Sequence, residues 1–344
     1  MNDWPELSRL RVTSCFYAIP SVLSCQRGRA LKHVNKLLLS LALLLCVFSL
    51  PESASAQNFK SALFKIYIED RKHGDFARTL LEIEKLIDPG IDVEANLAEI
   101  NALTARLQSM IPPKATSREK LRALQTFIYE PGPWNEGREF SYDLDDPNGD
   151  IFETRLLSTY LRTRKGNCVT MPFLVIVLGQ RIGLNVTAAT APLHILVKFT
   201  DDDGKTYNLE ATSGARGARD AHYRNLFPIT DRAIESGLYL DPLNREEMVG
   251  LATQTLVDHL LKEGRYEDAM PVSDIILHHY PAFGLGMVKK ATAAYHILKR
   301  DFYDKYPDPK DVPRDRHDRV RELQAINTAE FDKAEALGWK PHSR

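Results

Sequence analysis

Two neighbouring stretches of β-forming residues constrain the fold most, because the other periodic segments of the chain have helical spacing. The stretches are 186–199 (VTAATAPLHILVKF) and 205–212 (KTYNLEAT), and they flank the polar turn 200–204. Two strands joined by so short a polar loop form an antiparallel hairpin. Helices gathered around an antiparallel sheet belong to the α+β class, and this is the fold class that we expect.

The overall composition is that of an ordinary globular protein. Of the 344 residues, 44% are hydrophobic and 26% are charged, and the formal net charge is -1. This length allows roughly two domains, each with its own core. A chain so close to neutrality lacks the basic excess of nucleic-acid-binding proteins, so we expect no nucleic-acid partner.

An apolar run near the N-terminus indicates a cleaved export signal. Residues 37–50 are apolar, lysines precede them, and the small residues SASA follow at 53–56. This pattern predicts a signal peptide over residues 1–56 with cleavage after Ala56, and therefore a periplasmic or secreted protein. The alternative is a membrane anchor, but the run is shorter than the roughly 20 residues that a span needs. We expect no membrane span in the mature protein, and a true start near Val34 would explain the long stretch before the run.

The remaining segments are predicted mainly as helices before and after the hairpin. Apolar residues recur every three or four positions, which predicts helices over 58–88, 93–111, from Thr116 to Pro131, 150–164, 249–263, 267–280 and 283–298. The turn-rich stretch between them, 131–149, is expected to be a surface loop that lines a cleft. We divide the mature chain into a helical lead-in (57–114), a core (115–245), C-terminal helices (246–300) and a charged, solvated, partly mobile tail with a last helix (301–344).

Cys168 is the residue that most directly suggests chemistry. The other three cysteines precede residue 57, so the mature chain keeps one thiol and no intramolecular disulfide. The sequence KGNCVTMP at 165–172 places this thiol at or just before the start of an apolar helix, 173–182. Backbone N–H groups and the positive end of the helix dipole favour a thiolate there, and the same N–H groups could receive an oxyanion. The alternative is a buried cysteine that acts as a small hydrophobic residue.

The predicted hairpin supplies a base and an acid for this thiol. If residues 200–204 form the loop, the register places His194 directly opposite Glu210, close enough for the carboxylate to hold the imidazole. A tight turn at Asp203-Gly204 would instead place Glu210 on the other face of the sheet. A lone cysteine, a strand histidine and a facing glutamate together predict a nucleophile, a base and an orienting acid.

At these residues the chain resembles the transglutaminase-like superfamily. The resemblance rests on GNCVTMP at 166–172, RIGL at 181–184, APLHILVKF at 191–199 and YNLEATSG at 207–214, and it covers roughly residues 115–245. It implies a papain-like α+β core, in which a cysteine opens a helix that packs on an antiparallel sheet. Carried over by position, it implies Cys168 as the nucleophile, His194 as the base and Glu210 as the orienting acid. Most members have aspartate at the third position, so glutamate is a departure that adds one methylene of reach.

The implied chemistry is acyl transfer from the amide bond of a peptide or protein substrate. Hydrolysis and cross-linking differ only in the second nucleophile, and no residue of this sequence decides between them. We expect no cofactor. A metal site at Cys168 and His194 is a further alternative, but no additional ligands fall at zinc spacing.

A few other polar and aromatic residues are secondary candidates for the site. For the oxyanion or substrate site they are Trp134, Asn167 and Asn208, and Asn208 and Ser213 are also candidates for tuning the acid. Arg219, Asp220 and Tyr223 follow closely and are expected to be surface residues, with a place in the lining of the cleft as the alternative.

The predicted C-terminal helices suggest a second role. The sequence LKEGRYEDA at 261–269 and the closing Pro281 resemble part of a tetratricopeptide repeat, as in the bacterial branch of the superfamily, where such helices follow the core. There are too few units for a free-standing array, so we expect these helices to pack against the core or to hold a protein partner. The alternative function is therefore a catalytically silent binding module.

Overall fold

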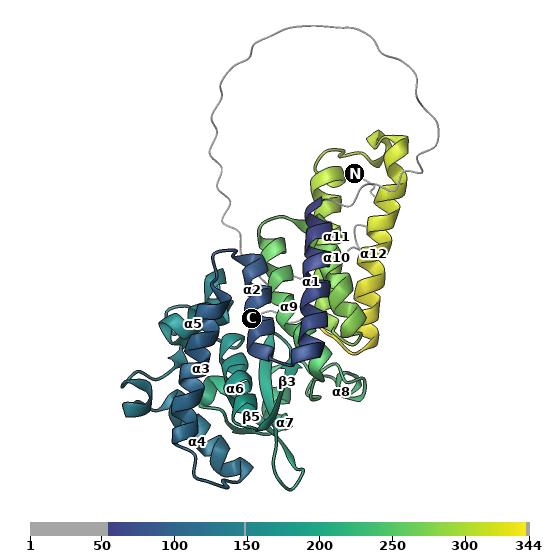
Figure 1. Ribbon diagram of the computed structural model, residues 1–344. Helices are drawn as coiled ribbons and strands as arrows, with labels where there is room; N and C mark the ends of the chain where they lie inside the picture. Colours follow the sequence, from purple (N-terminus) through teal and green to yellow (C-terminus); the bar gives the residue numbers. More distant parts are fainter. Residues whose placement is uncertain (1–53, 148, 342–344) are drawn as a thin grey trace, which may run out of the picture.

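The computed structural model describes residues 54–147 and 149–341 (Figure 1). Nearly all of the predicted signal peptide lies outside the described residues, and the first helix begins at Ala54. Within the described part of the chain, no helix combines the length and the apolar character that crossing a membrane requires.

Helices make up most of the structure, with an antiparallel sheet among them. The helices are α1 (Ala54–His73), α2 (Phe76–Ile87), α3 (Val93–Ser109), α4 (Ser117–Tyr129), α5 (Leu157–Thr163), α6 (Thr170–Arg181), α7 (Asp220–Leu226), α8 (Asp231–Glu235), α9 (Arg245–Lys262), α10 (Tyr266–His279), α11 (Gly284–Leu298) and α12 (His317–Ala336). The strands are β1 (Ser141–Tyr142), β2 (Lys165–Gly166), β3 (Asn185–Ala191), β4 (His194–Thr200), β5 (Thr206–Glu210) and β6 (Arg216–Ala218). Short helical turns are η1 (Pro133–Asn135), η2 (Phe152–Arg155), η3 (Ala211–Ser213), η4 (Lys299–Tyr303), η5 (Pro309–Asp311) and η6 (Arg314–Arg316).

Among the described residues, strands β3 to β6 form a four-stranded antiparallel sheet in the order β3-β4-β5-β6. Successive side chains of a strand point to opposite faces. Ile195 and Val197 belong to the same hydrophobic cluster as α6, whereas Leu196 belongs to a second cluster with residues of α7, α8, α11 and α12. The sheet is therefore covered on both faces, in agreement with the expected α+β class.

The stretch predicted as one strand, 186–199, forms two strands. Ala191 pairs with His194, so Pro192 and Leu193 make a two-residue turn between β3 and β4. Leu193 has φ 56°, in the left-handed region that costs a branched residue conformational energy. The proline inside an otherwise apolar run was the signal for this turn.

The hairpin between β4 and β5 has a shorter loop than the expected five residues. The Asp201 N–H donates to the Lys205 carbonyl at 3.0 Å, so the pairing continues to these residues. Gly204 closes the three-residue loop 202–204 with φ 77°, as is common in hairpin loops that end in a left-handed residue. This loop sets the register of the strands that carry the candidate base and acid.

Two predicted helices are interrupted. The segment 58–88 is divided at Gly74, which has φ 65°, and Asp75 then caps α2 by accepting a hydrogen bond from the Ala77 N–H at 3.1 Å. The segment 150–164 begins as the short turn η2 and becomes an α-helix only at α5. At the first interruption, a cap and a glycine with positive φ outweigh the continuous apolar periodicity.

The C-terminal helices pack against the core and against one another. Each of α9 to α12 contacts the next, while α1 lies on α10 and α2 lies on α9 (Figure 1). In the tail, the charged segment 304–319, expected to be solvated, is mostly exposed. The last helix, α12, packs along α11, and the buried apolar residues of the tail are Phe302, Val312, Val320, Leu323, Phe331, Ala334 and Trp339.

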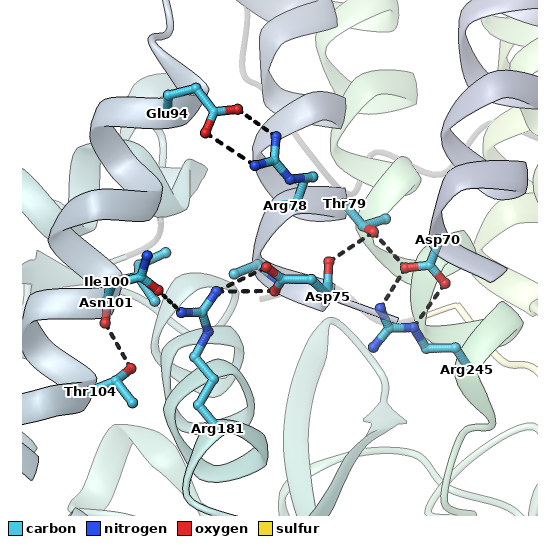
Figure 2. A network of polar contacts seen from close by, with 11 residues as sticks. Asp70, Asp75, Arg78, Thr79, Glu94, Ile100, Asn101, Thr104, Arg181 and Arg245 are labelled. Carbon is cyan, nitrogen blue, oxygen red and sulfur yellow. Dashed lines mark hydrogen bonds and ion pairs between the residues drawn. The ribbon is translucent and has the colours of Figure 1, made fainter. Parts of the chain in front are cut away.

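Charged side chains fix the C-terminal end of α6, the helix that follows Cys168 (Figure 2). Arg181, the last residue of α6, donates to the Asp75 carboxylate at 3.0 and 3.2 Å and is bonded to Asn101 of α3. Nearby, Arg245 of α9 is bonded to Asp70 of α1. Hydrogen bonds between charged groups are stronger than neutral ones. The Arg181 contacts therefore hold α6 against the start of α2 and α3, and the Arg245 contacts hold α9 against α1.

Glu84 is a buried carboxylate of α2 that caps another helix. Its Oε1 accepts from the Leu157 N–H at 2.5 Å and its Oε2 from the Ser158 N–H at 3.1 Å, at the start of α5. Burial raises the pKa of Glu84 to about 7, and the hydrogen bonds from Ser158 and Leu157 offset only part of this effect. Between pH 4.5 and pH 7, Glu84 therefore keeps its proton in the folded protein. The unfolded chain, in which the pKa of this residue is 4.5, releases the proton in the same range.

Replacing Glu84 with glutamine should change how stability depends on pH. Because the pKa is raised on folding, the cost of a charged Glu84 is absent below pH 4.5, grows as the pH rises and is complete above pH 7. The free energy of unfolding of the wild type should therefore fall relative to E84Q by up to roughly 3 kcal/mol over this range. Urea unfolding of both proteins at pH 5 and pH 8 measures the difference. An equal change in the free energy of unfolding of the two proteins between these pH values would contradict the prediction.

Candidate active site

The loop before α6 carries Cys168 and is fixed by the side chain of Asn167. Asn167 Oδ1 accepts from the Val169 N–H at 3.0 Å and the Thr170 N–H at 3.3 Å, and Nδ2 donates to the Thr154 carbonyl at 3.0 Å. Since α6 begins at Thr170, Cys168 lies just before a helix N-terminus, where the sequence placed it. The amide of Asn167 is thus committed to shaping the loop.

Gly166 lets this loop pass close to a buried ring. A Cβ at Gly166 would lie 2.6 Å from Tyr160 Cε2 and 2.7 Å from Thr170 Oγ1, and neither neighbour leaves room for it. Gly166 also pairs in parallel with Tyr142 of β1. The stretch 131–149, expected to be a loop lining a cleft, therefore contains a short strand beside the Cys168 loop.

His194 begins β4 directly after the turn that ends at Leu193. The side chain of Cys168 lies near enough to His194 to raise the pKa of its ring, and its Sγ lies 3.9 Å from the Leu193 carbonyl oxygen. His194 Nε2 is 2.8 Å from Glu210 Oε2, so Nδ1 is the ring nitrogen that remains for the sulfur. The ring of Phe227 stacks on the imidazole with centroids 5.9 Å apart. The structure thus brings the predicted nucleophile, base and acid together.

Glu210 reaches His194 diagonally across the sheet. Val197 pairs with Leu209, so the position opposite Glu210 is Leu196, two residues from His194 on the same face. The expected direct pairing is wrong, and so is the alternative register that placed Glu210 on the other face. Diagonal neighbours are about 7–8 Å apart, within reach of long side chains, and the longer glutamate suits this offset.

Further donors hold the Glu210 carboxylate. Thr212 donates its backbone N–H at 3.0 Å and its hydroxyl to Oε1, and the Tyr223 hydroxyl donates to Oε2 at 3.0 Å. Tyr223 is 0% exposed, so the expectation that it is a surface residue was wrong. The sequence gave a local signal for Thr212, two residues after an acid, but none for Tyr223, which comes from α7.

Hydrogen bonds and charges shift the pKa values of the base and acid in opposite directions. Burial alone lowers the pKa of His194, but its hydrogen bonds to Cys168 and Glu210 and their negative charges raise it to about 9. Burial raises the pKa of Glu210, but the contacts with His194 and Thr212 lower it to about 2. At neutral pH His194 is therefore an imidazolium between a carboxylate and the sulfur.

The secondary candidates lie outside this contact. Trp134 is not among the described residues that line the cavity at Cys168, and its Nε1 donates to the Glu130 carbonyl at 3.2 Å. Asn208 shares a sheet face with Glu210, but it donates to Asp220 Oδ1 at 2.6 Å. Ser213 is exposed. None of these side chains is placed to act on a carbonyl at Cys168.

A cavity opens at Cys168 between the core and the C-terminal helices. Its core side includes Asn167, Cys168, Leu193 and His194, and its helical side includes Gln254 and Asp258 of α9 and Lys289 of α11. Sequence reasoning did not predict that α9 and α11 face the thiol. Within the described part of the chain, no group of three or more His, Cys, Asp or Glu side chains is arranged to hold a metal ion.

Comparison with known protein families covers the part of the chain that contains this site. A family model for the transglutaminase-like superfamily matches residues 94–263. The match is wider than the resembling stretch 115–245 and takes in α3 and α9. Comparisons with curated proteins and with solved structures found no match. The chain therefore contains a transglutaminase-like superfamily domain at residues 94–263.

Proposed function

We propose that this protein is a cysteine-dependent enzyme that transfers acyl groups from amide substrates. The observation that carries the proposal is the contact of Cys168 with His194, whose ring Glu210 holds at 2.8 Å. A thiolate beside an imidazolium is poised to attack a carbonyl, and the imidazolium can protonate the leaving group. Membership of the transglutaminase-like superfamily supports the same chemistry.

The proposed reaction has two halves. In the first, the Cys168 thiolate attacks the amide carbonyl carbon, the C–N bond breaks, and His194 Nδ1 gives its proton to the departing amine, which leaves a thioester. In the second, water or another amine attacks the thioester while His194 accepts the proton, and the C–S bond breaks. Water gives hydrolysis and an amine gives cross-linking. Glu210 keeps Nδ1 turned toward the sulfur in both halves.

The oxyanion of each half needs backbone donors. The N–H groups of Val169 and Thr170 already donate to Asn167 Oδ1. The proposal therefore assigns the oxyanion to the N–H of Cys168 itself, at the positive end of α6.

We also propose that the protein is exported and that it acts on a partner outside the cytoplasm. The apolar run and small residues of segment 1–56 support export to the periplasm or beyond, and with it a peptide or protein of the cell envelope as substrate. The helix pair α9 and α10, joined at Gly264, supports a place in the bacterial branch with tetratricopeptide-like helices.

Trapping the acyl-enzyme tests the proposed function. The full chain is incubated with a cell-envelope extract, and the peptide that contains Cys168 is examined by mass spectrometry. We expect an acyl adduct that hydroxylamine removes, because a thioester is labile to it, and no adduct on C168A. The absence of any adduct, together with slow alkylation of Cys168, would favour the binding-module alternative.

A further inference from the structure

The helical wall of the cavity carries polar groups that the acyl-transfer steps do not use. Residues at helical spacing on α9 and α11 line this wall: Leu251, Gln254, Thr255 and Asp258, then Leu285, Val288 and Lys289. The α11 residues lie beyond the matched superfamily domain, which ends at residue 263. The wall is therefore built partly from the matched domain and partly from a helix that follows it.

Two buried cations and one carboxylate meet in this wall. Lys289 Nζ is 3.0 Å from Asp258 Oδ1, and Arg155 Nη1 is 3.6 Å from Asp258 Oδ2. Arg155 and Lys289 are each 7% exposed. Asp258 is the one carboxylate among the described lining residues, which also include Lys340. Among the described lining residues, the cations Arg155, Lys289 and Lys340 thus outnumber the one carboxylate.

Gln254, another residue of the cavity lining, has a buried hydrogen-bond acceptor. Its Nε2 donates to Asp258 Oδ1 at 3.2 Å, which fixes the orientation of the amide. Its Oε1 is buried and has no hydrogen-bond partner among the described residues. A buried acceptor of this kind is satisfied when a ligand supplies an N–H group.

The charged wall adjoins the thiol. Arg155 Nε donates to the Gly149 carbonyl at 2.8 Å. A Cβ at Gly149 would lie 3.1 Å from Asn167 Nδ2, and Asn167 directly precedes Cys168. Arg155 and Cys168 both line the cavity.

We propose that the cavity selects amide substrates that carry a carboxylate near the scissile bond. Arg155 and Lys289 bind the carboxylate, and Gln254 Oε1 accepts an N–H of the same substrate. This inference rests on the proposed function, because it names the substrate class of Cys168. The carboxylate can belong to a peptide C-terminus or to an acidic side chain, and the experiment distinguishes these sources.

Alkylation of Cys168 by acidic and neutral probes tests the inference. The probes are N-iodoacetyl-alanine, its amide, and N-iodoacetyl-glutamate α-amide; with each, the thiolate displaces iodide and a thioether forms. The full chain is alkylated at low salt, and the rate constant is measured on the peptide that contains Cys168. Dividing it by the rate constant of the same probe with glutathione removes intrinsic differences between the probes. We expect an acidic probe to react about tenfold faster than the neutral one. The favoured acid identifies a terminal or a side-chain carboxylate.

Charge-changing variants locate the effect in the wall. Lys289→Met should reduce the preference for the acidic probe and Asp258→Asn should increase it, because one removes a cation and the other the competing carboxylate. Lys290→Met is the matched control on the same helix, since Lys290 is not among the described lining residues and pairs with Glu330 at 2.9 Å. In that variant Glu330 still has Lys333 as an ion-pair partner at 3.0 Å. The preference for the acidic probe should therefore stay unchanged.

The outcomes separate this inference from the proposed function. Equal normalised rates for acidic and neutral probes on the wild type would overturn the inference while the thiol remains reactive. A preference that neither Lys289→Met nor Asp258→Asn alters would also overturn it, and the wild-type ratio decides if a variant does not fold. If no probe alkylates Cys168 faster than it alkylates glutathione, the proposed function itself fails.

Discussion

Replacing His194 with alanine should slow the alkylation of Cys168 by iodoacetamide at pH 6.5 at least about tenfold. In the wild type the pKa of His194 is raised to about 9, so the ring is positively charged at this pH and favours the thiolate, which is the reactive form. Without the ring a larger share of the thiol is protonated. The thioester adduct should disappear as well, because general acid–base catalysis contributes about 10²–10⁴-fold.

The measurement is the rate of carbamidomethylation of the Cys168 peptide between pH 5.5 and pH 9. His278→Ala serves as the control, because His278 is an exposed histidine of α10 and should leave the rate unchanged. If His194→Ala is alkylated as fast as the wild type across this pH range, the imidazole does not support the thiolate.

The position of the nucleophile could be predicted because its signals are local. A glycine and an asparagine before Cys168, and Pro172 at the start of an apolar run, specify a turn into a helix N-terminus. The meeting of His194 and Glu210 was predicted through a wrong register. The error still kept both residues on one face, because the expected and observed registers differ by two positions and side chains alternate with a period of two.

The rest of the site depends on contacts between distant segments. Nothing near Tyr223 in the sequence indicates that its hydroxyl reaches Glu210, and nothing near Lys289 indicates that α11 lines the cavity. Trp134 was proposed as an oxyanion donor by analogy of position, but its indole bonds to the preceding helix instead. Such contacts are set by how whole elements pack, which periodicity and caps do not encode.

Replacing Glu210 with glutamine should lower the pKa of His194 below its value of about 9 and reduce acyl transfer by about 10²–10⁴-fold. The carboxylate favours the charged ring, so its removal shifts the ring toward the neutral form at lower pH. NMR titration of the His194 ring measures the first effect, and the yield of thioester on Cys168 measures the second. Glu235→Gln, at an exposed residue of α8, should change neither.

The hydrogen-bond donors around Glu210 should make the fall in the pKa of His194 larger than the loss of one negative charge alone would cause. The Thr212 N–H and hydroxyl both donate to Oε1, so the amide oxygen of a glutamine takes that place and its NH₂ group turns toward His194. A donor facing Nε2 favours the neutral ring with its proton on Nδ1 and opposes the imidazolium. Glu210→Asp keeps the charge but shortens the diagonal reach, so His194 should titrate between the other two proteins. An unchanged titration near pH 9 in Glu210→Gln would mean that another group holds the charged ring.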